Sequence, residues 1–397
     1  MAARGDSPKG PDRFYELDIL RGLAAIIVVT FHYKHFLLIS DRAGFDYHDM
    51  PLHAILMPVY VYGQFFVELF FSISGYVFFW LYAEAIAARR IGLRGFFIAR
   101  FARLYPLYFV TFIAVALIQW AFHGLYGHDY IYGGNTFVNF ALNLVMAHQW
   151  LPHAVQNFNG PSWSISVEVF LYAVFFLLCR FRLQSVWTVA ALSVAGLFLR
   201  GLNPDTDFMR GLPSFFLGGL VWYFVTELRR HDVLRRRLAV ALAAVLPVLW
   251  GLTYVWGYDS LWLRITQALS RHGVHWPPVT TVGAFCYVLI PLTLLFFGLQ
   301  RGLWLKPERL KRFEWVGDIS YSVYLIHFPL QISLMLVLAQ LPFAARARIF
   351  SSPFAYLAFM AAAMGLAWFS YRYFETPMRK HIREWLAPRL ARLRPVR

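Results

Sequence analysis

Long apolar segments recur along this chain of 397 residues, and they restrict its possible folds more than any other feature. Each segment comes close to the ~20 residues that an α-helix needs to cross a lipid bilayer. Apolar residues make up 59% of the sequence and charged residues only 15%, which excludes a soluble globular protein. The segments are too long for the strands of a membrane β-barrel, so an all-α polytopic membrane protein is predicted. Ten transmembrane helices are expected, at residues 17–38, 57–83, 102–122, 162–181, 185–200, 211–228, 238–256, 279–300, 315–340 and 353–375.

One further apolar segment, residues 136–150, is short and contains several polar residues, so charge must decide its place. If it crossed the membrane, the arginine-rich segments 89–103 and 229–237 would lie on opposite sides. If it does not cross, both segments face the cytoplasm, as the positive-inside rule expects. We therefore predict one short non-spanning helix here and both termini in the cytoplasm.

The chain is predicted to consist of a cytoplasmic N-terminal segment (1–16), a transmembrane domain (17–377) and a basic cytoplasmic tail (378–397). Its net charge of +16 comes from short basic clusters between apolar segments, so membrane lipid is an expected partner and nucleic acid is not. Cys179 and Cys286 lie in apolar surroundings and have no metal-ligand spacing. No metal site is predicted.

The first span carries ionisable residues at membrane depth, where they are costly and usually functional. At ~100° per residue around a helix, Arg21 and His32 fall within ~20° of each other, and Asp18 lies ~40° from the same line. The three side chains therefore share one face. Because the rest of the span is apolar, this face is predicted to turn toward the protein interior or an aqueous cavity.

A second motif, Arg100–Pro106, lies at the cytoplasmic start of the third span. Arg100 and Arg103 are three residues apart, so on a helix their guanidinium groups project from one side and can bind a phosphate group. The alternative is that both are basic anchors that reach lipid headgroups. Taken alone, the motif favours the anchors.

A third motif, Val67–Tyr76, places Glu68 in a strongly aromatic span and adds Ser72, Ser74 and Gly75 within two turns. Small residues allow close approach of a ligand or of another helix, and for these three the sequence alone favours helix packing. Glu68 requires a partner or a proton at this depth.

A fourth motif, Pro161–Tyr172, begins the span after the non-crossing segment. Ser164 and Glu168 are four residues apart, so they share a helix face that enters the bundle from the outer side. The alternative is a helix whose carboxylate simply pairs with an arginine.

A fifth motif, Gly317–His327, has Ser320, Tyr324 and His327 at helical spacing, which places them in one stripe. His327 alone is more typical of a hydrogen-bonded core histidine than of a catalytic one.

Taken in order, these motifs resemble the acyltransferase-3 family of integral membrane acyltransferases, whose members acylate sugars of polysaccharides, lipid-linked glycans and related glycosides. The resemblance runs from Leu17 to about Pro377. It is carried by L-D-I-L-R-G with His32 closing the same helix, V-E-L-F-F-S-I-S-G-Y, R-F-A-R-L-Y-P-L-Y, W-S-I-S-V-E-V-F-L-Y and I-S-Y-S-V-Y-L-I-H-F-P.

The resemblance implies a multi-pass protein of the bacterial cytoplasmic membrane that moves an acyl group, with acetyl expected, to a hydroxyl of a carbohydrate or glycolipid acceptor. The implied donor is acetyl-CoA or another acyl-CoA, which is a co-substrate, so no tightly bound cofactor is expected. The resemblance also implies that His32 is the essential histidine and that Arg100 and Arg103 bind the donor.

Acyl transfer to a hydroxyl needs a base, and we expect His32 to be that base, with Asp18 and Arg21 organising the cavity below it. Helix rise places His32 ~22 Å from the cytoplasmic start of the first span, in the outer half of the bilayer. Glu68 and Glu168 are candidates to orient His32 or to contact the acceptor. The other candidates are Ser74 and Gly75 for the donor, and Ser164, Tyr324 and His327 for the acceptor. Direct transfer and a covalent acyl-histidine intermediate both stay open.

A proton-coupled transporter is the main alternative, because the buried carboxylates and histidines could form a proton relay. The sequence shows neither the inverted repeat nor the paired broken helices that many transporters have. A structural scaffold, in which the buried charges serve only packing, is disfavoured by five polar motifs that converge on one cavity.

Overall fold

The computed structural model describes residues 13–38, 47–151, 154–202, 206–258, 278–304 and 306–391. Over these residues the chain is helical and contains no β-strand, which confirms the predicted all-α class. Most of the predicted N-terminal segment and the last residues of the predicted tail lie outside the described residues.

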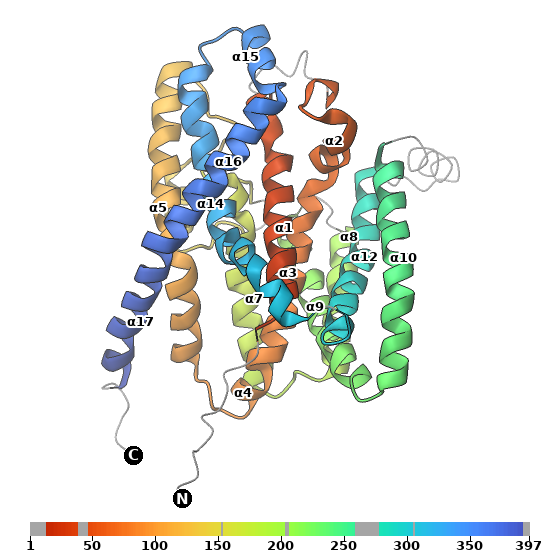
Figure 1. Ribbon diagram of the computed structural model, residues 1–397. Coiled ribbons are helices and arrows are strands. Elements are labelled where there is room, and N and C mark those ends of the chain that lie inside the picture. Colours follow the sequence, from red (N-terminus) through yellow and green to blue (C-terminus); the bar gives the residue numbers. More distant parts are fainter. Residues whose placement is uncertain are drawn as a thin grey trace, which may run out of the picture.

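Within the described residues, each of the ten predicted spans coincides with a helix of the bundle in Figure 1. These helices are α1 (Tyr15–His32), α3 (Phe66–Phe78), α5 (Leu93–Tyr126), α7 (Trp163–Arg180), α8 (Val186–Leu202), α9 (Phe208–Leu228), α10 (Asp232–Tyr258), α12 (Pro278–Gln300), α14 (Glu314–Leu338) and α16 (Pro353–Ser370). The shorter helices are α2 (His53–Tyr62), α4 (Glu84–Ala87), α6 (Phe137–Leu144), α13 (Pro307–Leu310), α15 (Phe343–Phe350) and α17 (Thr376–Ala391). By length and composition, seven helical stretches of the described chain can cross a membrane, as expected of a polytopic membrane protein.

The short helix α6 occupies the segment that was predicted not to cross. It has eight residues, which corresponds to ~12 Å of helix, far less than the ~30 Å apolar core of a bilayer. Thr136 caps its N-terminus by accepting a hydrogen bond from the backbone of Asn139 at 3.2 Å. A capped helix of this length does not span a membrane.

The second predicted span differs from the expected single helix. It is interrupted by a 3₁₀ turn at Gly63–Phe65 and by a π-helical turn at Phe79–Ala83. The carbonyl of Gln64, in the first interruption, accepts a hydrogen bond from Arg210 at 2.9 Å. Irregular turns in a helix leave backbone carbonyl groups without a partner in the helix. The free carbonyl group of Gln64 bonds to Arg210 and so joins α9 to the start of α3.

The last predicted span also continues further than expected. α16 leads through a π-helical turn at Tyr371–Glu375 into α17, which runs to Ala391. The predicted boundary between domain and tail at residue 377 therefore falls inside a helix. At the turn, the buried carboxylate of Glu375 accepts a hydrogen bond from Ser322 of α14 at 2.8 Å.

Glycines bring two pairs of helices unusually close. A Cβ on Gly75 of α3 would lie 1.8 Å from the carbonyl oxygen of Phe215, and one on Gly218 of α9 would lie 1.9 Å from that of Ser72. Only glycine fits at such a crossing, as in other membrane bundles. A Cβ on Gly317 of α14 would likewise lie 2.4 Å from the backbone of α1.

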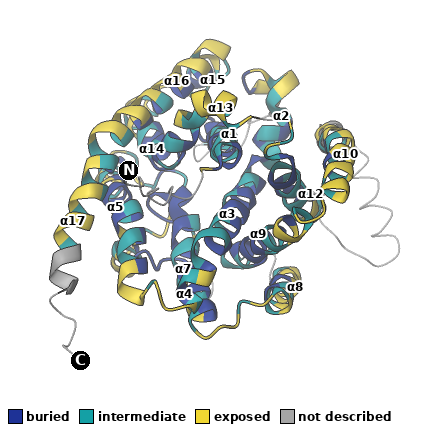
Figure 2. Cartoon of the chain, turned by 60° about the horizontal axis from the view of Figure 1, so that its bottom comes forward, coloured by how far each residue is buried: buried dark blue, intermediate teal, exposed yellow. Residues whose placement is uncertain are grey.

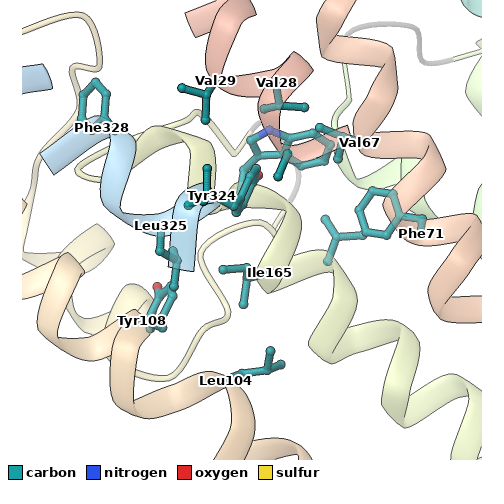
Figure 3. Packing of buried hydrophobic residues seen from close by; sticks show 14 of the residues in the cluster. Val28, Val29, Val67, Phe71, Leu104, Tyr108, Ile165, Tyr324, Leu325 and Phe328 are labelled. Atoms are coloured by element: carbon teal, nitrogen blue, oxygen red, sulfur yellow. The ribbon is translucent and has the colours of Figure 1, made fainter. Parts of the chain in front are cut away.

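The core lies where these helices meet. Figure 2 shows buried residues concentrated on α1, α3, α7, α9 and α14, with exposed residues on the outward faces of α8, α10, α16 and α17. Figure 3 shows the buried side chains of Phe71, Ile165 and Tyr324, from α3, α7 and α14, gathered in the interior. An exposed apolar perimeter around a packed aromatic core is the arrangement expected for helices surrounded by lipid.

Candidate functional site

A cavity lies among α1, α3, α5, α7 and α14, with about 790 Å³ of empty space that includes its opening to solvent. Its lining combines apolar rings with charged and hydroxyl side chains, which is typical of a ligand site. Seven of the candidate site residues are in its wall: Arg21, Ser74, Arg100, Arg103, Ser164, Glu168 and Tyr324.

Arg21 reaches the cavity from the close contact between α1 and α14. Its Nε donates to Ser320 Oγ at 2.9 Å, and a terminal nitrogen donates to the carbonyl oxygen of Gly317 at 2.7 Å. Asp18 lies one turn earlier and pairs with the same guanidinium at 3.2 Å. The predicted shared face of Asp18, Arg21 and His32 is confirmed, because all three residues meet α14.

Arg100 and Arg103 line the cavity from α5, but they are held differently. Arg100 is buried, donates to the hydroxyl of Tyr82 at 2.6 Å and lies over the ring of Phe78, with its guanidinium carbon 5.2 Å from the ring centre. Arg103 forms no hydrogen bond or ion pair with another described residue. It therefore offers a complete guanidinium fork to a ligand. Arg21, Arg100 and Arg103 are called the arginine end of the cavity below.

Two further arginines approach this end from α17. The charge of Arg383 interacts with those of Arg100 and Arg103, and Arg379 lies beside Arg383 and near Glu375. The carboxylates of Glu168 and Glu375 act on Arg103 with the opposite sign. The helix that continues the last predicted span, α17, thus adds positive charge to the arginine end, which sequence reasoning did not assign to the site.

Glu168 is held inside the cavity by two hydroxyl groups. Its Oε1 accepts hydrogen bonds from Ser74 at 2.7 Å and from Tyr172 at 2.6 Å. Glu168 was a candidate to orient His32 or to contact the acceptor; it lines the cavity without contacting His32, and its hydrogen bonds connect α7 with α3. Tyr172 was not predicted, although it lies four residues after Glu168 on the same helix face.

Tyr324 and Ser164 form the cavity wall opposite the arginine end. Their hydroxyl groups lie 2.7 Å apart, and Tyr324 also donates to the carbonyl oxygen of Pro161. Ser320 and Tyr324 both line the cavity from α14, and His327 follows on the same stripe. The predicted stripe on this helix is confirmed.

A cluster of three histidines lies behind this wall. The ring centre of His327 is 4.9 Å from that of His32 and 6.1 Å from that of Tyr324, and His35 lies 5.2 Å from His32. His32 is 8% exposed, and His327 is fully buried. His32, His35 and His327 are called the histidine cluster below. No group of three or more potential metal ligands was found among the described residues.

The hydrogen bond of His32 fixes which ring nitrogen can accept a proton. Its Nδ1 lies 2.9 Å from the carbonyl oxygen of Val28, an acceptor, so Nδ1 must carry the hydrogen. Nε2 then has the free lone pair. Gln331 of α14 donates to the carbonyl oxygen of His32 at 3.0 Å and fixes the end of α1.

The comparisons with known proteins bear on what this cavity does. A family model described as an acyltransferase domain matches residues 14–372, nearly the whole chain. The chain belongs to the acyltransferase-3 family. The protein is therefore a membrane acyltransferase, and the transporter alternative is set aside.

Curated relatives agree with this assignment. The chain is 27% identical to the acyltransferase MdmB of Streptomyces mycarofaciens over 342 residues, which cover 80% of each chain. It is 25% identical over 342 residues to BcsY of Komagataeibacter xylinus, named as a membrane-bound transacylase, covering 80% of this chain and 73% of that one. A stretch of 121 residues, 30% of this chain and 51% of the other, is 37% identical to protein 2 of the picA locus of Rhizobium radiobacter. No solved structure shows significant similarity to the chain.

Five candidate residues of the acyltransferase lie outside the cavity lining: Asp18, His32 and His327, described above, and Glu68 and Gly75. Glu68 is 1% exposed and accepts two hydrogen bonds from Arg210, at 2.8 and 3.1 Å. Asp207 completes this buried pair at 3.1 Å from Arg210. Gly75 faces α9 rather than the cavity, which agrees with the helix-packing interpretation of its motif. Arg210 directly precedes the predicted span 211–228, and its charge, opposite to that of Glu68, was the sequence signal that could have paired the two residues.

Proposed function

We propose that this protein is a membrane-embedded O-acyltransferase that moves an acyl group from a cytoplasmic acyl-CoA to a hydroxyl of a carbohydrate acceptor, with His32 as general base. One observation carries the proposal. The arginine end and Tyr324 line the same cavity, and the histidine cluster begins directly behind Tyr324. An anion site and a proton acceptor are the two groups that this reaction needs from a protein.

The arginine end suits the phosphate groups of CoA. Guanidinium groups bind phosphate through paired, charge-assisted hydrogen bonds. Arg103 has all its donors available, while Arg21 and Arg100 are fixed by their own partners and supply charge. The arginines of α17 extend the positive field toward the end of the bundle where the basic segments lie.

The distance between the arginine end and the histidine cluster suits a thioester that enters from the arginine end. Ser320, which holds Arg21, and His327, which lies beside His32, are seven residues apart on α14. This spacing corresponds to ~10 Å of helix rise. The phosphate groups can therefore stay at the arginines while the acyl carbon approaches the histidine cluster.

In the proposed reaction, Nε2 of His32 takes the proton from the acceptor hydroxyl as its oxygen attacks the thioester carbon. The bond from carbon to sulfur breaks, and the proton passes to the departing thiolate, so that an ester and free CoA are formed. The hydroxyl groups of Tyr324 and Ser164 lie on the side of the cavity nearest the histidines, where they can hydrogen-bond an acceptor. The acetyl group and the carbohydrate class of the acceptor follow from the family resemblance.

The proposed topology has ten membrane crossings, with both termini in the cytoplasm of a bacterium. It is supported by the helix that coincides with each predicted span, by the short α6 and by the positions of the basic segments. α17 ends toward the same end of the bundle from which α1 rises (Figure 1).

The test is an assay of acyl transfer with purified protein in lipid nanodiscs. Acetyl-CoA is supplied together with a panel of soluble glycans and glycolipids, and free thiol release is followed along with the mass of each acceptor. We expect thiol release that depends on an acceptor and an acceptor heavier by one acetyl group. His231→Ala, which alters an exposed histidine outside the cavity, is the matched control for His32→Ala. Equal transfer by the two variants would refute the role of His32.

A further inference from the structure

A second pocket, separate from the acyl-transfer cavity, contains three arginines. It is formed by Arg229 at the end of α9, Arg235 in α10 and Arg301 after α12, with Phe14 and Trp80 beside them. It encloses about 970 Å³ of empty space that includes its opening to solvent. Neither the proposed reaction nor the family resemblance assigns it a role.

Two of the three arginines of this pocket are held in place by the end of α12. Arg229 donates to the carbonyl oxygen of Gly298 at 2.8 Å, and Arg235 donates to that of Leu299 at 2.8 Å. The last carbonyl groups of a helix have no partner within the helix, so these hydrogen bonds provide a partner for the carbonyl groups and for the arginine side chains. Guanidinium groups fixed in this way lose little side-chain entropy when they bind a ligand.

Aromatic residues lie next to the arginines in the pocket wall. The guanidinium carbon of Arg301 lies 3.7 Å from the ring centre of Phe14, and the ring of Trp80 meets that of Phe14 edge to face at 4.4 Å. One part of the pocket is cationic and the adjoining part is aromatic. Tryptophan and arginine in such a pair are typical of the boundary between lipid tails and headgroups.

Two carboxylates moderate the positive charge without cancelling it. Glu16 is 2% exposed, and its charge acts on Arg229 and Arg301. Asp232 lies 3.6 Å from Arg235 and is largely exposed. Neither carboxylate lines the pocket. An anion in the pocket would therefore meet three guanidinium groups.

The pocket lies beside a surface that faces lipid. α10 is at the edge of the bundle, and most of its described side chains are exposed (Figure 2). Val233 and Leu234, directly before Arg235, are 67% and 48% exposed, as expected of side chains in contact with acyl chains. A lipid molecule could therefore reach the arginines from the side.

We propose that this pocket binds the phosphate group of an acidic phospholipid of the cytoplasmic leaflet. The three arginines surround the phosphate, and the rings of Phe14 and Trp80 contact the glycerol and upper acyl chain. Basic pockets between transmembrane helices on this side of a membrane recognise anionic headgroups. A bound lipid would hold the ends of α9, α10 and α12 against the start of α1.

The test uses native mass spectrometry of the purified full-length protein with phosphatidylglycerol and phosphatidylcholine of identical acyl chains. We expect the wild type to retain phosphatidylglycerol in preference to phosphatidylcholine. Each basic residue near an acidic headgroup contributes a factor of about five, so the double variant Arg229→Gln/Arg301→Gln should bind phosphatidylglycerol about 30-fold more weakly. The matched control is Arg236→Gln, which removes an exposed arginine next to Arg235 and should bind as the wild type does.

Three outcomes would overturn the proposal: equal retention of the two lipids by the wild type, equal losses in the double variant and in Arg236→Gln, or displacement of the lipid by adenosine 3′,5′-bisphosphate. The last result would assign the pocket to a soluble nucleotide such as the one in CoA. If the double variant does not fold, the single variant Arg301→Gln decides. It keeps both arginines that hold the end of α12 and should lose about fivefold in affinity.

Discussion

The arginine end of the cavity and the histidine cluster behind its opposite wall differ in how their polar side chains are satisfied. At the arginine end, Arg21 and Arg100 have hydrogen-bond partners, whereas Arg103 has none in the described part of the chain. In the histidine cluster, the ring of the fully buried His327 lies against the backbone of Val323 and Tyr324 and has no hydrogen bond of ordinary geometry to any described residue. Buried polar groups are normally paired, so the polar groups of this cluster are held less firmly than those of the arginine end.

The arginine end is suited to binding, and the histidine cluster is suited to proton transfer. Guanidinium groups are permanently charged and suit an anion that has to be held, whereas imidazoles can accept and return a proton. A site in which these two kinds of group lie apart can bind a charged donor without placing that charge beside the base. Changes at the histidine cluster should therefore affect turnover, and changes at the arginine end should affect donor affinity.

The largest expected effect is on turnover in His32→Ala. Loss of a general base lowers the rate by about 10²-fold to 10⁴-fold. The dissociation constant of CoA, measured by calorimetry, should stay within twofold of the wild-type value, because His32 lies outside the arginine end. If CoA binding weakened as much as turnover fell, the two ends would not have separate roles.

The next effect concerns stability, and it tests a buried ion pair that lies outside the cavity. Glu68→Ala leaves Arg210 buried with Asp207 as its remaining carboxylate partner, and removing one member of a buried pair costs about 3–5 kcal/mol. We expect a matching loss in the free energy of unfolding, followed by tryptophan fluorescence in detergent.

The control for this variant is Glu227→Ala, which removes an exposed pair with Arg230 at 2.9 Å. Exposed pairs contribute less than about 1 kcal/mol, so its unfolding midpoint should barely move. Equal destabilisation of the two variants would mean that Glu68 and Arg210 are not a buried pair.

A smaller effect is expected on donor affinity in Arg103→Ala. A charge-assisted hydrogen bond contributes about 1.5–3 kcal/mol, so the dissociation constant of CoA should rise by about 10-fold to 100-fold. Arg94→Ala removes an exposed arginine from the same helix and is the matched control. Indistinguishable affinities in calorimetry would return Arg103 to the role of a lipid anchor.

The smallest effect is expected for Tyr324→Phe, which removes one hydroxyl from the wall next to the histidine cluster. A neutral hydrogen bond contributes about 0.5–1.5 kcal/mol, so kcat/KM for the acceptor should fall by about twofold to 10-fold while CoA binding is unchanged. Tyr105→Phe is the control, because the hydroxyl of Tyr105 bonds to the backbone of Leu144 outside the cavity. An effect on CoA binding instead would place Tyr324 at the donor.

Much of the arrangement could be predicted because it depends on spacing within one helix. The shared face of Asp18, Arg21 and His32 and the stripe of Ser320 and Tyr324 follow from the helical repeat. Arg100 and Arg103 were correctly placed on one side of α5, although the different partners that hold them were not foreseen.

Contacts between helices were harder to predict. Glu168 and Glu68 were candidates to orient His32 or to contact the acceptor. The partners that they have, Ser74 for Glu168 and Arg210 for Glu68, were not foreseen. His35 was overlooked because it follows the end of α1, where a 3₁₀ turn brings its ring beside His32. Each of these contacts depends on how one helix is rotated relative to its neighbour.

The sequence by itself determined the membrane helices, the polar face of each and the family, because these depend on apolar length, on the 3.6-residue repeat and on local motifs. Only the tertiary structure decided which polar faces meet. The glycine contacts of α3 with α9 and of α1 with α14 set those pairings, and they place Glu68 in a buried ion pair while Arg21 and Glu168 line the cavity. The physical reason is that helix packing is fixed by close contact between surfaces far apart in the chain, which no local pattern encodes.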